Sequence, residues 1–418
     1  MNSKSKSTLT LRIERPAYGD MSISRYQGKI VLVNGAFLPG ESVEAVIEKE
    51  KKDYISVSVL KLVESSPERI NPECEYFGSC GGCHLQHIPY DLQIKLKEEV
   101  LSDCLKRIGK IDAELSGPLI PDSPWNYRFR AQYKISGNTI GFFKGKTREV
   151  VNIESCPLMT QEINRYYRKA RDIVSLNRII RELHIISGDT AVALVKLSSG
   201  EATAPDLEQL AVQFTAAGFS GVIMENKDRE RFGYGRTYAT LELAELAYSV
   251  SPSCFFQSSW KLNNQLIDHI KNALSPLAGK DILDLHAGSG NFSLPLAEAD
   301  RIVAVEDNPA AIENGKRSVA MNEIKNFTFI NSSAEDYMTD DQFDIVITDP
   351  PRTGLKSTVI HNLLSMLPER IVYISCNPTT LARDLKSLVD KYDVASVRLV
   401  DFFPQTYHIE SLVFLKLR

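Results

Sequence analysis

The chain has 418 residues, enough for two or three domains, and 43% hydrophobic and 24% charged residues, as in ordinary globular proteins. Its 49 Lys and Arg against 53 Asp and Glu give a net charge of −4, which excludes a uniformly basic nucleic-acid coat. The N-terminal segment lacks a signal-peptide pattern, and no apolar run is long enough to span a bilayer, so we expect a cytoplasmic protein without membrane partners.

Residues 1–65 alternate short apolar runs with Gly and Pro, which predicts about five short strands. So many strands in so short a segment favour a small OB-like β-barrel, a fold that often binds oligonucleotides. A structural β-domain without a ligand fits the same pattern equally well.

Residues 66–250 have a mixed α+β pattern, and we expect a central domain there, with a helix over residues 161–183. The stretch CEYFGSCGGCHLQH spaces Cys74, Cys80 and Cys83 closely, and Cys156 follows far downstream. Close thiols with glycines between them indicate a metal site, although the spacing alone does not separate zinc from an iron–sulfur cluster.

Residues 125–148 form a basic and aromatic segment, WNYRFRAQYKISGNTIGFFKGKTR, which contains no acid. Basic side chains bind phosphates and aromatic rings stack on unpaired bases, so we expect RNA to bind here. A β-hairpin with its aromatic side chains turned inward is the alternative.

Residues 251–418 alternate short apolar runs with helical patterns, which predicts a doubly wound α/β domain with a mainly parallel sheet. The short connection before the last run predicts an antiparallel final strand. The expected strands are 281–285, 301–305, 327–330, 343–348, 370–375, 397–403 and 411–417.

A glycine turn, HAGSGNFS, follows the first of these strands, and the next strand ends at Glu306. A carboxylate there can accept hydrogen bonds from ribose hydroxyls. The turn lacks the third glycine of a dinucleotide-binding fingerprint, which favours a nucleoside without phosphates, namely S-adenosylmethionine. A glycine turn that only packs a helix is the alternative.

Two further strands end in polar residues, Asp349 in TDPPRTG and Cys376 in SCNP, and Glu410 opens the last strand. Ligands of open α/β sheets bind beyond the carboxyl ends of the strands, so these side chains should share one crevice. A thiol nucleophile, a methyl donor and a carboxylate base suit methylation of uracil C5. A packed thiol and a surface carboxylate are the alternatives.

These motifs together resemble the RNA uracil-C5 methyltransferase family, whose members modify 23S rRNA and the T-loop of tRNA. The resemblance is carried by FFQ at 255–257, the glycine turn at 284–292, DPPRTG at 349–354, SCNP at 375–378 and HIE at 408–410. It implies a Rossmann-like class I methyltransferase domain at 251–418 and an N-terminal TRAM domain at 1–65.

The resemblance also implies the roles of individual residues. Cys376 is the expected nucleophile and Glu410 the base that removes the C5 proton. The residues expected to bind S-adenosylmethionine are Gln257, His286, Asn291, Glu306 and Asp349. The residues expected to hold a [4Fe–4S] cluster are Cys74, Cys80, Cys83 and Cys156.

The chain departs from the family pattern at His286-Ala287, where the family usually has an aromatic residue and a cysteine. It also departs at Ser259, where the family usually has an asparagine two positions after FFQ. These departures keep open a metal-stabilised RNA-binding protein with a degenerate transferase site. A transferase acting at nitrogen or oxygen is a further alternative. We expect a monomer that acts on RNA and not on DNA, with 23S rRNA favoured over a tRNA T-loop.

Overall fold

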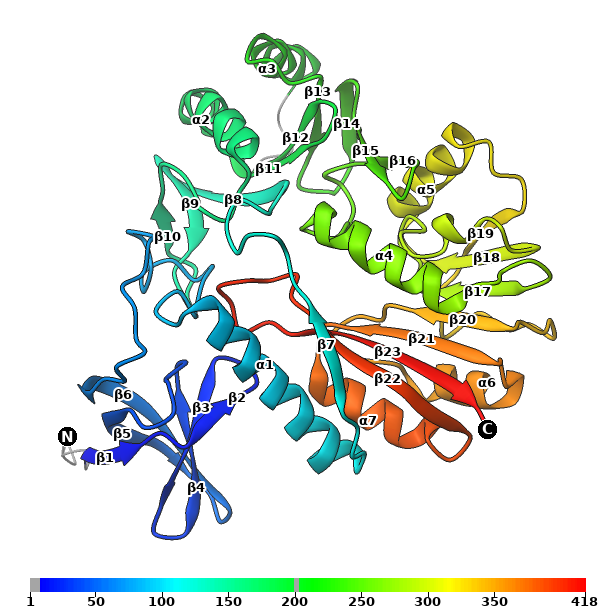
Figure 1. Ribbon diagram of the computed structural model, residues 1–418. Coiled ribbons are helices and arrows are strands. Elements are labelled where there is room, and N and C mark those ends of the chain that lie inside the picture. The colour runs from blue at the N-terminus through cyan, green and yellow to red at the C-terminus, as the bar shows by residue number, and fades with distance from the viewer. Residues whose placement is uncertain (1–7, 199–202) are drawn as a thin grey trace.

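The computed structural model describes residues 8–198 and 203–418 (Figure 1). Within these ranges the strands form sheets of six, seven, two and eight strands. The six-stranded sheet lies at the N-terminal end, the seven-stranded sheet in the central region, and the eight-stranded sheet at the C-terminal end. In these ranges no helix is long and apolar enough to cross a membrane.

The N-terminal sheet is an OB-like barrel with the strand order β1-β5-β6-β4-β3-β2. Buried and exposed side chains alternate along its strands, as the sequence predicted, and Val31, Val43 and Val57 fill the interior. The Ser24 hydroxyl donates to the Arg12 carbonyl (2.6 Å), which ties β3 to the end of β1. The strands are β1 (Thr8–Arg12), β2 (Arg15–Ala17), β3 (Met21–Tyr26), β4 (Lys29–Asn34), β5 (Ser42–Glu50) and β6 (Tyr54–Glu64).

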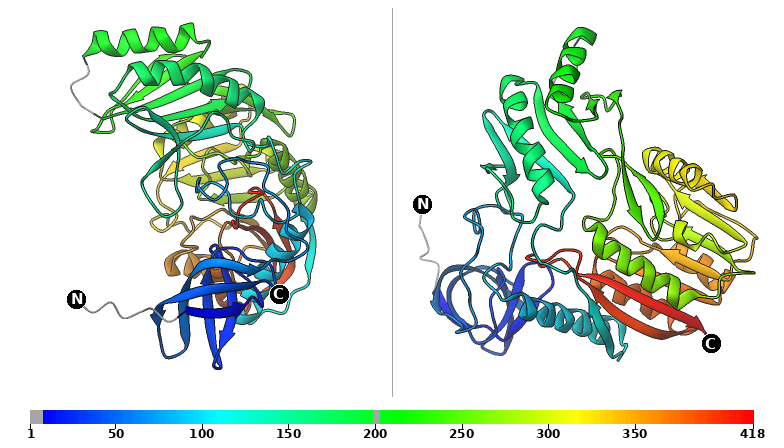
Figure 2. Two further views of the ribbon diagram at one scale, coloured as in Figure 1. Left: turned by 90° about the vertical axis from the view of Figure 1, so that its left-hand side faces the viewer. Right: turned by 45° about the horizontal axis from the view of Figure 1, so that its top comes forward.

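The segment after the barrel contributes to the C-terminal part of the molecule. Helix α1 (Tyr90–Cys104) continues into a π-helical turn, Leu105–Gly109, and strand β7 (Leu115–Leu119) pairs in parallel with β22 (Tyr392–Val400). Helix α1 lies between the barrel and the C-terminal sheet (Figures 1 and 2). The C-terminal sheet therefore takes its edge strand from the range expected for the central domain.

The central sheet has the order β10-β9-β8-β11-β12-β13-β14, and helices α2 (Gln161–Leu176) and α3 (Ala204–Ala216) pack on it. The helix expected over 161–183 was predicted too long, because Asn177 ends α2 and a buried strand begins at Ile180. The strands are β8 (Arg130–Ser136), β9 (Thr139–Phe143), β10 (Val150–Asn152), β11 (Ile180–Ser187), β12 (Ala191–Leu197), β13 (Gly221–Glu225) and β14 (Arg231–Gly235).

The C-terminal sheet has the order β19-β18-β17-β20-β21-β23-β22-β7. A hairpin, β15 (Ala239–Leu243) and β16 (Leu246–Val250), precedes it. The expected doubly wound sheet is confirmed, and β23 runs antiparallel to both neighbours, as its short connection predicted. The remaining strands are β17 (Asp281–Leu285), β18 (Arg301–Glu306), β19 (Phe327–Asn331), β20 (Ile345–Thr348), β21 (Arg370–Ser375) and β23 (Glu410–Leu417).

Two apolar layers enclose this sheet because successive side chains of a strand point to opposite faces. Val372 and Ile374 of β21 join the layer under α4, whereas Ile371 and Tyr373 join the layer under α1, α6 and α7. The helices on the sheet are α4 (Trp260–Leu274), α5 (Pro309–Met321), α6 (Ser357–Met366) and α7 (Pro378–Leu388). Burial on both faces leaves the carboxyl ends of the strands as the place for a ligand.

Candidate active site

A cleft of about 900 Å³ lies at the carboxyl ends of β17, β18, β20 and β21. All seven residues expected to bind the methyl donor or perform the chemistry line this cleft. They are Gln257, His286, Asn291, Glu306, Asp349, Cys376 and Glu410. The rule that ligands bind at this edge of a parallel sheet predicted that Asp349, Cys376 and the glycine turn share the cleft, whereas Gln257 was expected there only from the family resemblance.

The thiol and the carboxylate face each other across two strands. Strands β21 and β23 pair antiparallel with Ser375 opposite Ser411. Cys376 follows Ser375, and Glu410 precedes Ser411, so the two occupy the next facing positions. Asp349 directly follows β20, the other neighbour of β21, and completes a row of three functional groups.

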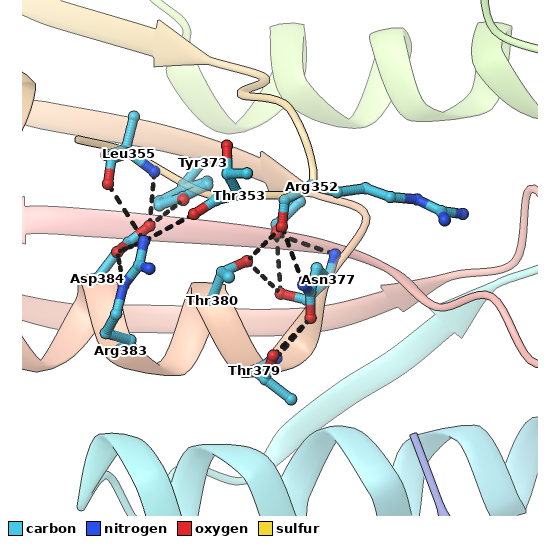
Figure 3. Close-up of polar contacts among 10 residues, drawn as sticks. Arg352, Thr353, Leu355, Tyr373, Asn377, Thr379, Thr380, Arg383 and Asp384 are labelled. Carbon is cyan, nitrogen blue, oxygen red and sulfur yellow. Dashed lines mark hydrogen bonds and ion pairs between the residues drawn. The ribbon is translucent and has the colours of Figure 1, made fainter. Parts of the chain in front are cut away.

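The Asn-Pro pair after Cys376 explains why the strand stops there. Asn377 is the N-cap of α7, its side-chain oxygen accepts from the Thr379 amide (3.1 Å), and Pro378 occupies the first helical turn. The Asn377 amide also donates to the Arg352 carbonyl (2.9 Å; Figure 3). Asn377 thus connects the segment that follows Cys376 to the loop after Asp349.

The same helix holds the rest of the loop at residues 349–356. The Asp384 carboxylate accepts from the Leu355 amide (2.8 Å) and the Tyr373 hydroxyl (2.7 Å), and the Arg383 guanidinium donates to the Thr353 carbonyl (2.9 Å; Figure 3). A Cβ on Gly354 would approach the Asp384 carboxylate to 2.4 Å, and its φ is +73°, so glycine is required there. This network connects the wall of the cleft to α7.

Burial dominates the electrostatics of the proposed catalytic groups. It raises the pKa of Cys376 to about 12, and the nearby Glu410 and Asp349 carboxylates add to this effect. Burial also raises the pKa of Asp349 to about 7 and, together with Asp349, holds that of Glu410 well above its usual range. Without ligands, the site therefore favours a protonated Cys376 thiol.

Arg352 is the basic group beside these acids. Its positive charge opposes the rise in the pKa of Cys376 and of Glu410. Its side chain donates to His408 Nδ1 (2.9 Å), and burial followed by the Arg352 charge lowers the pKa of His408 to about 3. His408 is therefore a neutral acceptor that orients the guanidinium, and the family motif HIE did not indicate this pairing.

Gln257 presents an unsatisfied acceptor to the cleft. Its side-chain nitrogen donates weakly to Asp349 (3.4 Å), while its buried Oε1 has no hydrogen-bond partner among the described residues. A buried amide oxygen without a partner is unfavourable unless a ligand donates to it. A ligand group with N–H donors would supply the missing hydrogen bond to this oxygen.

Glu306 and His286 lie on either side of the glycine turn. The Glu306 carboxylate accepts from the backbone amides of Gly288 (2.8 Å) and Asn308 (2.9 Å), which orients it toward the cleft. His286 adopts a left-handed φ of +60°, and its Nδ1 lies 3.2 Å from the Thr348 hydroxyl. Burial lowers the pKa of His286, so a neutral ring stands where the family usually has an aromatic residue.

Asn291 pairs with a helix behind the turn. Its amide exchanges two hydrogen bonds with the amide of Asn263 in α4, at 2.7 and 3.0 Å. The side chain therefore anchors the glycine turn to α4, and this reciprocal pair was not indicated by the sequence.

The segment that carries His408 and Glu410 is anchored by residues that the sequence did not single out. Lys97 of α1 forms a buried ion pair with Asp401 (2.7 Å), and Gln93 exchanges hydrogen bonds with Gln405 (2.9 and 3.0 Å). The backbone amide of His84, next to Cys83, also donates to the Gln405 carbonyl (2.8 Å). Helix α1 and the residue after Cys83 thus fix the position of residues 401–405, which lead to Glu410.

The four expected cluster ligands line a separate cavity of about 240 Å³, namely Cys74, Cys80, Cys83 and Cys156. The buried Gln86 side-chain nitrogen lines this cavity and has no hydrogen-bond partner among the described residues. Across residues 8–198 and 203–418, however, no three His, Cys, Asp or Glu side chains form a group that could hold a metal ion. The expected metal centre is therefore not shown.

The basic and aromatic segment follows the inward-facing alternative in its first half. Tyr127, Phe129 and Tyr133 are buried in the protein interior. Phe143 remains 38% exposed, and the three basic side chains after it are open to solvent: Lys144, Lys146 and Arg148. The exposed basic side chains of the segment therefore gather at this end.

Comparison with known proteins identifies the family. The family model described as tRNA (Uracil-5-)-methyltransferase matches residues 89–418. The chain belongs to this family. An uncharacterized RNA methyltransferase of Aquifex aeolicus is 35% identical, with 98% of this chain and 99% of the relative covered. The 23S rRNA (uracil(1939)-C(5))-methyltransferase RlmD of Salmonella paratyphi A is 32% identical, with 94% and 92% covered.

A solved structure supports the same assignment for the whole fold. The Pyrococcus abyssi tRNA (uracil-54, C5)-methyltransferase, in complex with S-adenosyl-L-homocysteine, matches with a TM-score of 0.74 at 25% identity. The match covers 97% of this chain and 100% of that chain. The expected family, α/β fold and enzyme class are confirmed: the chain is an S-adenosylmethionine-dependent RNA uracil-C5 methyltransferase. It stays a prediction that the protein is a monomer, that it is cytoplasmic and that it does not act on DNA.

Proposed function

We propose that this methyltransferase modifies C5 of one uridine in 23S rRNA through a covalent bond between Cys376 and C6 of the uracil. The observation that carries this proposal is the facing pair of Cys376 and Glu410 in the cleft that also contains the glycine turn. A thiol serves no purpose in methylation at nitrogen or oxygen, whereas C5 of uracil reacts only after a nucleophile adds to C6.

The proposed reaction begins at C6 of the uracil. The Cys376 thiol first loses its proton to solvent, and the thiolate adds to C6 of the flipped uracil. The resulting enolate attacks the methyl carbon of S-adenosylmethionine, and S-adenosylhomocysteine leaves. Glu410 then takes the proton from C5, and the C6–S bond breaks to restore the double bond and the thiolate. Arg352, beside both groups, favours their ionised forms.

Gln257, His286, Glu306 and Asp349 are proposed to bind S-adenosylmethionine, with Asn291 holding the glycine turn. The Gln257 and Asp349 side chains accept from the ammonium of the donor, and Glu306 accepts from its ribose hydroxyls. The neutral ring of His286 packs beside the adenosine. The unpartnered Gln257 oxygen and the buried acids support a ligand that carries positive charge.

The affinity for S-adenosylmethionine is expected to rise with pH and to level off above about pH 7. The pKa of Asp349 is about 7 in the free enzyme, and the cationic donor favours the carboxylate, so binding releases a proton below that pH. Each linked proton changes affinity by at most about tenfold per pH unit. Calorimetric titrations between about pH 5.5 and pH 8 measure this. Asp349→Asn should bind more weakly and without this slope, and a flat wild-type profile would contradict the assignment.

The four cysteines around the second cavity are proposed to hold a [4Fe–4S] cluster. A tetrahedral zinc site would need all four sulfurs within about 4 Å of one another, because Zn–S bonds are about 2.3 Å long. The four cysteines line a cavity of about 240 Å³, which is larger than a single ion needs. Arg128 and Gln86, whose side-chain nitrogen has no partner among the described residues, also line it, and such a cation and such a donor suit a negatively charged group. Methyl transfer needs no electron, so the role of a cluster bound there would be structural. It would stabilise the segment that contains Gln405, whose carbonyl accepts from the His84 amide next to Cys83.

Anaerobically purified protein is therefore expected to contain roughly four iron and four acid-labile sulfide atoms per chain. Cys83→Ser and Cys156→Ser should each remove most of this iron and lower methylation, because the Gln405 segment loses its support. Cys104→Ser is the matched control, since that thiol is buried in α1 away from the cavity. Zinc, or iron that survives both substitutions, would refute the cluster.

The target RNA is decided by mass spectrometry of ribonucleosides and RNA fragments from cells with and without this gene. We expect loss of 5-methyluridine from a single 23S rRNA fragment, as the resemblance to the Salmonella enzyme supports. Loss from the tRNA T-loop instead would support the tRNA alternative, which the Pyrococcus enzyme represents. Unchanged 5-methyluridine in every fragment would favour an RNA-binding protein with a degenerate transferase site.

A further inference from the structure

Tyr18 of the N-terminal barrel reaches the proposed nucleophile segment. It lies in the turn between β2 and β3, and its hydroxyl donates to the Cys376 carbonyl oxygen (3.1 Å). Its ring meets that of Tyr407 edge-on, with centroids 6.2 Å apart and planes at 83°. Tyr407 precedes Glu410 by only three positions, so one barrel side chain contacts both segments that carry the proposed chemistry.

We infer that Tyr18 is a positioning residue for methyl transfer, through which the barrel completes the active site. This inference rests on the proposed covalent mechanism and deepens it. The barrel would then do more than bind RNA, because the position of the Cys376 thiol would depend on a residue from a different domain.

The carbonyl that Tyr18 contacts lies between two regular elements of the backbone. The ladder between β21 and β23 ends at Ser375, and α7 begins at Pro378, so Cys376 lies between the two elements. A hydrogen bond to its carbonyl oxygen fixes the plane of the following peptide and limits the orientations of the thiol. The strength of such a bond matters most where no regular ladder holds the chain.

The geometry of the turn and the state of the hydroxyl suit this role. Gly19 and Asp20 follow with φ values of +93° and +57°, a pair of left-handed residues that turns the chain sharply and leaves Tyr18 at the edge of the barrel. Burial raises the pKa of Tyr18 to about 12, so the hydroxyl stays protonated and remains a donor at neutral pH.

The barrel is docked by other contacts that do not depend on this hydroxyl. Arg15 pairs with Asp103 of α1 (3.1 Å), and His87 Nε2 lies 3.0 Å from the Ala36 carbonyl. Leu38 of the barrel packs with Leu85 and other apolar side chains of the next segment. Removing only the Tyr18 oxygen should therefore leave the arrangement of the domains intact and isolate its effect on Cys376.

The test uses the full-length protein, S-adenosylmethionine and a 23S rRNA transcript spanning uridine 1939 made with 5-fluorouridine, the position named for the Salmonella relative. After methyl transfer the fluorine on C5 cannot leave as a proton would, so the Cys376–RNA adduct is trapped. Tyr18→Phe should slow adduct formation about 3- to 10-fold at saturating RNA, with unchanged RNA affinity and unfolding temperature. Tyr26→Phe makes the same change in β3 and is expected to match the wild type.

Each other result counts against the inference. An adduct rate for Tyr18→Phe equal to that of Tyr26→Phe overturns it and leaves the covalent mechanism standing. Weaker RNA binding with an unchanged rate also overturns it, because Tyr18 would then act through RNA alone. If the wild type forms no adduct with this transcript or with a tRNA T-arm transcript, the proposed mechanism fails and the inference with it.

Discussion

Replacement of Cys376 by alanine is expected to lower the rate of uracil methylation by at least about 1000-fold, equivalent to about 4 kcal/mol in the activation barrier. Without a thiolate on C6, the C5 carbon is not nucleophilic enough to attack the donor methyl group. Transfer of labelled methyl groups from S-adenosylmethionine to RNA measures the rate. The variant should still bind donor and RNA, since the thiol is one group among many in the cleft.

The matched control for this variant is Cys104→Ala. It removes an equally small thiol that is 8% exposed in α1 and does not line the cleft. Its expected defect is a modest loss of stability without loss of the covalent adduct. If Cys376→Ala keeps more than about a tenth of wild-type activity, Cys376 is not the nucleophile and the thiol only packs the end of β21.

The catalytic sheet was predictable because its strands are short apolar runs bounded by polar residues. Strands β17 and β21 begin and end where the runs 281–285 and 370–375 indicated, and the carboxyl-edge rule then placed Asp349 and Cys376 in one cleft. The helix over 161–183 was predicted wrongly at its end. Its basic residues continued the helical pattern, but Asn177 breaks it and Arg181 belongs to β11.

The supports of the active site were not predictable, because they join segments more than 300 residues apart. Lys97 and Asp401 look like surface charges in the sequence, yet they are 3% and 1% exposed and form an ion pair. Gln93 and Tyr18 carry no local pattern that distinguishes them from other polar residues of a helix or a turn. These contacts depend on how α1 and the barrel pack against the C-terminal part of the chain, and the periodicity of the sequence does not indicate that packing.

Glu410→Gln is expected to convert the enzyme into one that forms the methylated adduct but releases it slowly. Glutamine matches glutamate in shape but cannot take the C5 proton, so the C6–S bond cannot break. We expect turnover to fall by at least about 100-fold while a Cys376–RNA adduct that survives denaturing electrophoresis accumulates. Glu369→Gln, an exposed glutamate just before β21, should show neither effect.

The amount of methyl group transferred in the first turnover of Glu410→Gln distinguishes a general base at position 410 from a residue that only stabilises the fold. Loss of the negative charge at Glu410 lowers the pKa of Cys376, because that carboxylate is one cause of its rise, so addition to C6 should be at least as fast as in the wild type. One methyl group per enzyme should therefore be transferred rapidly before turnover stalls. A variant that turns over slowly without accumulating adduct would place the C5 proton on another base, and Asp349, the remaining buried carboxylate of this row, would be the group to replace next.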